Sequence, residues 1–76
     1  MKDFVEYLVK NLVDETADVQ VACQEADDGM HLEVRVAKPD IGKVVGREGR
    51  TVRALRTLVQ TIGARHGKRI RIEILD

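Results

Sequence analysis

Residues 44–52 read Val-Val-Gly-Arg-Glu-Gly-Arg-Thr-Val, and this stretch decides the fold. Two apolar residues lead into a Gly-x-x-Gly turn, and a long amphipathic pattern begins directly after it. This order predicts a short helix, a tight turn and a second helix. The first N–H groups of a helix have no intrahelical partner, and the helix dipole is positive at the same end. The turn is therefore expected to attract phosphate.

The two glycines of this turn, Gly46 and Gly49, permit backbone angles that are closed to other residues. They also carry no side chain, so the backbone of a ligand can come close to the turn. The residues between them are expected to point outward, which suits Arg47 for contact with a phosphate. The N–H groups around Glu48, Gly49 and Arg50 are predicted to donate to that phosphate.

The chain before the turn predicts a helix and then a hairpin. Apolar residues recur at three- and four-residue spacing over residues 2–13, which is typical of a helix with one buried face. Apolar and polar residues alternate over 18–26 and 30–37, which predicts two half-buried strands. Asp27-Asp28-Gly29 between them is a hairpin turn signal. Phe4 of the helix and Cys23 of the first strand are both expected in the core.

The chain after the hairpin predicts two helices and a last strand. Asp40 is expected to cap a short helix over residues 41–45. A long helix is predicted over 50–66, and strict alternation over 69–75 predicts a third strand. The long helix has a core face formed by Val52, Leu55, Val59 and Ile62.

Two helical glycines each have two explanations. Gly42 allows either close packing or the close approach of a ligand, and the sequence does not separate these. Gly63 either ends the long helix early or permits a close helix contact.

The elements together predict an α+β fold in one domain spanning residues 1–76. Their order is helix, strand, strand, short helix, Gly-x-x-Gly turn, helix, strand. The inward faces of the strands can meet the apolar faces of the helices, which gives helices on one face of a three-stranded sheet. The crossover from second to third strand should be right-handed, and adjacent strands would then be parallel in a mixed sheet.

The pattern apolar-apolar-Gly-x-x-Gly-x-x-apolar at residues 44–52 resembles the signature of the KH domain, whose loop clamps about four nucleotides. The order of the flanking elements extends the resemblance over nearly the whole chain. The sequence is similar to the KhpA-type family of small bacterial RNA-binding proteins, each made of one type II KH domain. The resemblance implies binding of single-stranded RNA, a homodimer, and pairing with a larger bacterial KH-domain protein. It also implies a post-transcriptional regulator or RNA chaperone.

The charge distribution supports a nucleic-acid partner although the net charge is zero. Residues 1–40 hold four Lys/Arg and ten Asp/Glu, a net −6, whereas residues 41–76 hold nine and three, a net +6. The positive half contains the glycine turn. The candidate RNA-binding residues are Lys43, Gly46, Arg47, Glu48, Gly49, Arg50 and Arg53.

Glu48 is a departure from a basic KH loop, because a carboxylate beside phosphate weakens binding unless it turns away or pairs with Arg47 or Arg50. A weak, general RNA binder, strengthened by a second KH surface, is therefore the preferred form. The alternative is a KH-fold interaction or dimerisation module with little RNA affinity. The broad apolar arc of the long helix, which includes Ala54 and Leu58, favours that alternative. Single-stranded DNA is kept as an alternative ligand.

An enzyme is not expected. The chain has no Ser/His/Asp or Cys/His set and no metal-spaced cluster, and its glycines fit neither a P-loop nor a dinucleotide fingerprint. Neither a metal nor a cofactor is predicted. The chain has no apolar run of about 20 residues that would span a membrane, no visible secretion signal and one cysteine, which together predict a cytoplasmic protein.

Overall fold

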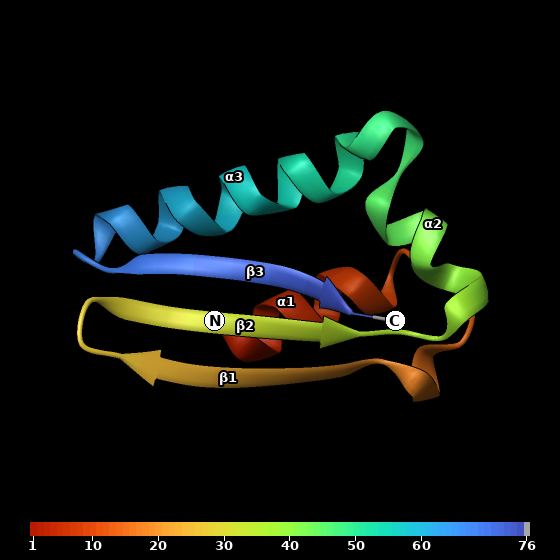
Figure 1. The fold of residues 1–76 in the computed structure, drawn as a ribbon, viewed down its shortest axis with the longest axis horizontal. Helices are drawn as coiled ribbons and strands as arrows, with labels where there is room; N and C mark the ends of the chain where they lie inside the picture. The colour runs from red at the N-terminus through yellow and green to blue at the C-terminus, as the bar shows by residue number, and fades with distance from the viewer. Residues whose placement is uncertain (76) are drawn as a thin grey trace.

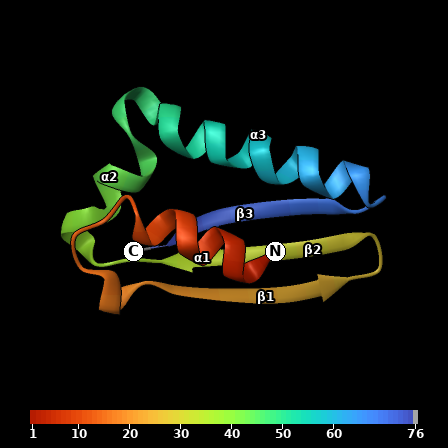
Figure 2. The same ribbon diagram turned by 180° about the vertical axis from the view of Figure 1, so that it is seen from behind.

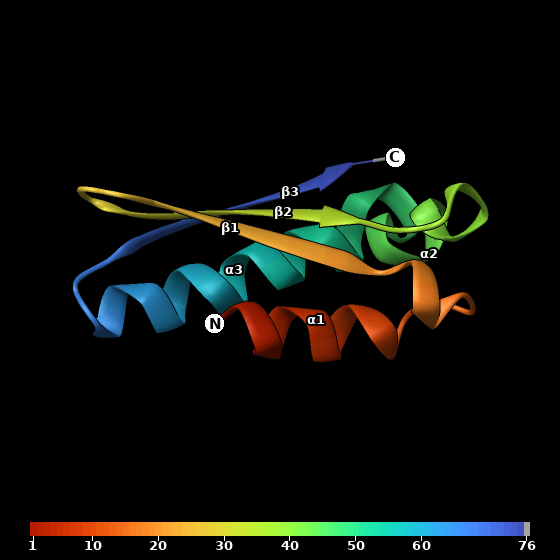
Figure 3. The ribbon, with the colours of Figure 1, turned by 90° about the horizontal axis from the view of Figure 1, so that it is seen from below.

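The computed structural model describes residues 1–75 as a three-stranded sheet with its helices on one face (Figures 1 and 3). The α+β class that the sequence predicts is confirmed. The helices and strands are α1 (Lys2–Lys10), β1 (Gln20–Ala26), β2 (Gly29–Arg35), α2 (Ile41–Val45), α3 (Arg50–Arg65) and β3 (Arg69–Leu75). Short 3-10 helices lie in the connections at Thr16–Asp18, Lys38–Asp40 and Arg47–Gly49. None of the helices described is long and apolar enough to cross a membrane.

The sheet is mixed, with β2 in the centre. β1 pairs with β2 in antiparallel register, with Cys23 opposite Leu32. β3 pairs with the other side of β2 in parallel register, with Ile72 beside Leu32. The return from β2 to β3 passes through α2 and α3, and α1 lies across the same face of the sheet, as the view from behind shows (Figure 2). β3 is therefore an edge strand, and α3 runs along it (Figure 1).

α2 and β3 have the predicted bounds, whereas α1 ends three residues earlier than predicted. Its last turn tightens, because the Leu12 N–H donates to the Val9 carbonyl oxygen at 2.9 Å, an i to i−3 bond. The Asn11 side chain also donates to the Tyr7 carbonyl oxygen at 2.7 Å. That side-chain bond competes with continuation of the helical ladder.

The core lies between the sheet and the helix layer. Each helix contributes small branched side chains, with Val5 and Val9 of α1 fully buried against the strands. Val44 of α2 is also fully buried, so the short helix before the glycine turn is held by the same core. The other core residues are Val13, Val19, Val21, Leu32, Val34, Val36, Leu55, Val59, Ile70 and Ile72.

Two residues expected in the core are exposed. Cys23 lies on the same face of β1 as the buried Val21, but it is exposed. Its thiol contacts the Met30 sulfur at 3.8 Å. Phe4 is 38% exposed, because Val5 and Val9 take the face of α1 that meets the sheet. The periodicity located the helix and the strand but overestimated how much of each is covered.

The hairpin contains Asp27 and Asp28 at its tip, and Gly29 opens β2. Gly29 does not have a positive φ, so the turn does not require glycine there. A Cβ on Gly29 would instead lie 1.7 Å from the carbonyl oxygen of Arg69. The glycine therefore allows β3 to approach β2 closely at the start of the parallel pairing.

The two helical glycines have different environments. A Cβ on Gly63 would lie 2.8 Å from both the Lys68 carbonyl oxygen and the Ile70 side chain, so this glycine allows the end of α3 to pack on the start of β3. Gly63 does not end the helix, which continues to Arg65. Gly42 has nothing within 4 Å of its added Cβ, which rules out close packing within the described chain.

Replacing each of these glycines by alanine is expected to give opposite results. Alanine has the higher helix propensity at both positions, so Gly42→Ala should raise the free energy of unfolding by about 0.5 kcal/mol. Gly63→Ala should lower it by about 1–3 kcal/mol, because the added methyl overpacks against β3. Urea denaturation measures both values. Equal effects of the two substitutions would contradict the proposed contact at Gly63.

Candidate nucleic-acid interface

Gly46 and Gly49 both have the positive φ that the sequence predicts for the turn, which joins α2 to α3. Gly46 has φ 79° and ψ 171°, a region that essentially only glycine adopts. An added Cβ there would also lie 2.2 Å from the Thr51 Oγ1 and 2.8 Å from the Thr51 backbone nitrogen. Gly49 has φ 73°, but its Cβ would meet nothing closer than the Arg53 guanidinium at 3.9 Å. Gly46 is therefore required by both angle and space, and Gly49 by angle alone.

Glu48 shares the left-handed conformation, with φ 57° and ψ 25°. It is the one non-glycine residue of the described chain with a positive φ, a conformation that costs roughly 1 kcal/mol or more. Arg50 then returns to right-handed helical angles, with φ −67° and ψ −40°. The step from the left-handed Gly49 to the right-handed Arg50 is a backbone conformation that also occurs at anion-binding sites.

The backbone N–H groups of the turn are only partly free. The Gly49 N–H donates to the Gly46 carbonyl oxygen at 3.1 Å, and the Arg50 N–H donates to the Arg47 carbonyl oxygen. The prediction that these two donate to phosphate is therefore wrong for this conformation. The Glu48 N–H has no backbone acceptor within residues 1–75. Of the three predicted donors it is the one available to a ligand.

Two arginines contact Glu48, one at its carboxylate and the other at its backbone carbonyl oxygen. Arg50 Nη2 lies 3.4 Å from Glu48 Oε2, so the carboxylate pairs with Arg50, one of the two partners expected for it. Arg53 Nη2 donates to the Glu48 carbonyl oxygen at 3.2 Å, and this bond helps to stabilise the left-handed conformation of Glu48. The Arg50–Glu48 pair is largely exposed and therefore weak. Arg47 is exposed and has no ion pair within the described part of the chain.

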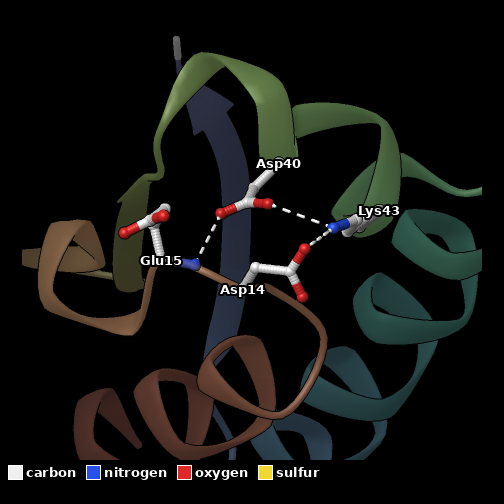
Figure 4. Close-up of polar contacts among 4 residues, drawn as sticks. All are labelled: Asp14, Glu15, Asp40 and Lys43. Carbon is white, nitrogen blue, oxygen red and sulfur yellow. Dashed lines mark hydrogen bonds and ion pairs between the residues drawn. The ribbon is translucent and has the colours of Figure 1, made fainter.

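Lys43, another candidate, is already paired. Its ammonium lies against the Asp14 carboxylate and 3.5 Å from Asp40 Oδ1 (Figure 4). The hydrogen bond that the Lys43 ammonium donates to the Asp14 carboxylate raises the pKa of Lys43, so the charge is kept but is balanced by two carboxylates. Lys43 therefore stabilises the base of α2 and offers less net charge to a phosphate than its place in the sequence indicates. Across residues 1–75 no three metal-ligating side chains come together.

Asp40 is 2% exposed and holds α2 to the connection that follows α1. Its carboxylate accepts a hydrogen bond from the Glu15 backbone N–H at 2.9 Å (Figure 4). No side-chain bond caps α2, so the predicted capping role of Asp40 is wrong. The sequence did not reveal this contact, because Glu15 is 25 residues away. The Glu15 N–H is the main reason why the pKa of Asp40 is lowered.

Arg56 is a basic residue near the turn that the sequence analysis omitted. It is exposed on α3, three residues after Arg53, which itself follows Arg50 by three. Residues three apart on a helix are neighbours on its surface. The regular spacing of the three arginines was the signal that could have identified it.

Asp40→Asn is expected to destabilise the protein at pH 7 in urea denaturation, because the amide cannot replace the charged acceptor between Glu15 and Lys43. The folded-state pKa of Asp40 lies below its ordinary value of 3.8. Its stabilising contribution is therefore complete above that value and is lost as pH falls through the lowered pKa. The difference between the two proteins should shrink at low pH. Asp18→Asn, at an exposed carboxylate, is the control. A difference that stays constant with pH would contradict this account.

Comparison with known proteins places the whole arrangement in one family. Residues 2–74 match the family model described as KhpA/KhpB, KH domain. RNA-binding protein KhpA of Streptomyces coelicolor is 49% identical over all of this chain and 92% of its own length. RNA-binding protein KhpA of Chlamydia caviae is 42% identical, with 100% and 97% covered. RNA-binding protein KhpA of Listeria monocytogenes is 38% identical, with both chains covered completely.

Proposed function

Because this chain belongs to the KhpA/KhpB KH-domain family, we propose that it is a non-catalytic module that clamps single-stranded RNA at its Gly-x-x-Gly turn. Residues 1–76 act as one KH domain in the cytoplasm. The protein serves as a post-transcriptional regulator or RNA chaperone, as a homodimer or with a larger bacterial KH-domain protein. The relatives named as RNA-binding proteins over the same length support the choice of ligand.

The observation that carries this proposal is the turn from Gly46 to Arg50. It combines the available Glu48 N–H, the start of a long helix and the unpaired Arg47. Backbone donors and a helix start favour an anion without reading its sequence. Arg53 and Arg56 extend the positive charge along α3. Lys43 contributes by keeping α2 in place. The other candidate residues contact the RNA backbone directly; they are Gly46, Arg47, Glu48, Gly49, Arg50 and Arg53.

The bases are expected to lie beside the turn, between α3 and the exposed edge of the sheet. β3 is an edge strand, and such a strand has backbone N–H and C=O groups that no neighbouring strand pairs. These groups can form hydrogen bonds with base edges while the turn holds the phosphates. The small number of aromatic residues, one Phe and one Tyr, fits a clamp of this kind better than a stacking surface.

Gly49→Asp and Gly49→Asn form a matched pair that tests the clamp. Gly49 has open space around its Cβ, and Asn and Asp have the same size and tolerate left-handed angles. We expect Gly49→Asp to weaken binding of short single-stranded RNA by more than about tenfold, because like charges at an interface cost several kcal/mol. Gly49→Asn should weaken it by less than about threefold. Fluorescence anisotropy at two salt concentrations measures both.

Equal affinities of the folded Asp and Asn variants would overturn the phosphate clamp. Failure of the wild-type protein to bind RNA at low salt would overturn the RNA function of the isolated chain. Gly46→Asp is less suitable for this test, because its side chain would collide with Thr51 and disturb the turn itself. Single-stranded DNA of the same sequence, tested in parallel, separates the two possible ligands.

A second function, self-association, is supported by the outer face of α3. Leu58 is 41% exposed, and the exposed Ala54 lies one helical turn before it. An exposed apolar strip of this kind is suited to a second KH domain. Pairing of two weak RNA sites would raise the overall affinity.

Leu58→Glu is expected to raise the dimer dissociation constant by more than about tenfold, because it places a charge in an apolar contact. The monomer should remain folded, since this side chain is already partly in water. Sedimentation velocity measures the oligomeric state. Leu12→Glu is the matched control, with Leu12 37% exposed after α1. A wild-type monomer, or a dimer lost only in the control, would contradict the use of α3.

A further inference from the structure

We propose that single-stranded RNA contacts a second basic subsite at the far end of α3, built by Lys68, Arg69 and Arg71. This inference rests on the proposed RNA function and extends it beyond the glycine turn. The ligand group is the phosphate backbone of the same RNA strand that the turn holds.

The subsite is a surface hollow of about 540 Å³ where α3, the start of β3 and the tip of the β1–β2 hairpin meet. α3 contributes Gln60 and Ala64, the turn into β3 contributes Lys68, and β3 contributes Arg69 and Arg71. The hollow thus lies where α3 runs beside the edge strand. Its place extends the region beside α3 and β3 where the proposed function puts the bases.

The charges in the hollow favour an anion. Lys68, Arg69 and Arg71 are exposed, and none of them has an ion pair among the residues that the structure describes. One carboxylate, Asp28 of the hairpin, lines the same hollow. Three positive groups against one negative group leave a net positive site. Guanidinium groups bind phosphate through paired hydrogen bonds, so two arginines suit this ligand.

The backbone around the hollow is held in place. The Arg69 N–H donates to the Asp28 carbonyl oxygen at 3.0 Å, and the Lys68 N–H donates to the Gly63 carbonyl oxygen at 2.9 Å. Gly67, which also lines the hollow, has φ 67° and nothing within 4 Å of an added Cβ. The backbone that carries the basic side chains is therefore held in place.

The position of the hollow sets the length of RNA that would reach it. The hollow and the glycine turn lie at opposite ends of α3 (Figure 1), a helix of 16 residues. At 1.5 Å per residue this separates the two sites by roughly 20 Å. A KH loop holds about four nucleotides. Because the turn itself engages about four nucleotides, we expect contact with the hollow to need further nucleotides, and a strand of about ten to occupy both sites.

The test compares RNA of about four and about ten nucleotides on the wild-type protein and on Arg69→Gln/Arg71→Gln. We expect the wild-type protein to bind the longer RNA more tightly than the shorter one. The double variant should reduce the affinity for the longer RNA by about fivefold or more, with little change for the shorter RNA. For each phosphate contact that is lost, the slope of log K against log salt concentration should also become less steep by about 0.7. Lys2→Gln/Arg65→Gln, with the same change in charge outside the hollow, is the control.

Asp28→Asn provides a gain of affinity that cannot result from misfolding. It removes the carboxylate of the hollow and should tighten binding of the longer RNA by about twofold or more. Asp27→Asn changes the charge by the same amount next to it, but Asp27 does not line the hollow, so its effect should be smaller.

Three results would overturn the inference. Equal wild-type affinities for the two RNA lengths would do so while leaving the clamp at the glycine turn intact. The same holds if the longer RNA binds more tightly but Arg69→Gln/Arg71→Gln and its control have equal effects. That result would mean that the hollow does not bind RNA. No binding at either length would remove the proposed RNA function as well.

Discussion

The structure depends on the backbone of the turn between α2 and α3. Gly46 takes angles that only glycine tolerates, and its missing Cβ leaves room for Thr51 at the start of α3. Glu48 and Gly49 follow in left-handed conformations, so the chain leaves one helix and enters the next within a few residues. This reversal places the start of a long helix and an available N–H next to Arg47, Arg50 and Arg53 in the chain. A side chain at Gly46 would disturb all of these together.

The turn is useful only if α2 stays in place, and the buried Asp40 ensures this. It connects the N-terminal segment, through the Glu15 N–H, to the base of α2, and Lys43 closes the same network (Figure 4). The acidic N-terminal half thus neutralises one cation of the basic half, Lys43, through Asp14 and Asp40. The net charge of zero conceals this division, since most of the remaining cations lie on α3 and β3.

The sequence predicted the fold well, because period-two and period-3.6 patterns mark strands and helices directly. The bounds of α2 and β3 and the mixed sheet followed from such local signals and from the rules for crossovers. The errors concern contacts between distant segments. Asp40 accepts a hydrogen bond from the Glu15 N–H rather than capping α2, and Cys23 is exposed although Val21 on the same strand face is buried. The turn conformation was predictable from its glycines, but the use of the Gly49 and Arg50 N–H groups inside the turn was not.

The central claim is that the glycine turn holds RNA phosphates, and amide NMR shifts test it most directly. The ¹⁵N-labelled protein would be titrated with a single-stranded RNA of about four nucleotides. The account predicts that the amide resonances of Arg47, Glu48 and Gly49 shift first and furthest, with the Glu48 amide leading because its N–H is available. Shifts confined to α1, or to the open face of the sheet, would contradict it.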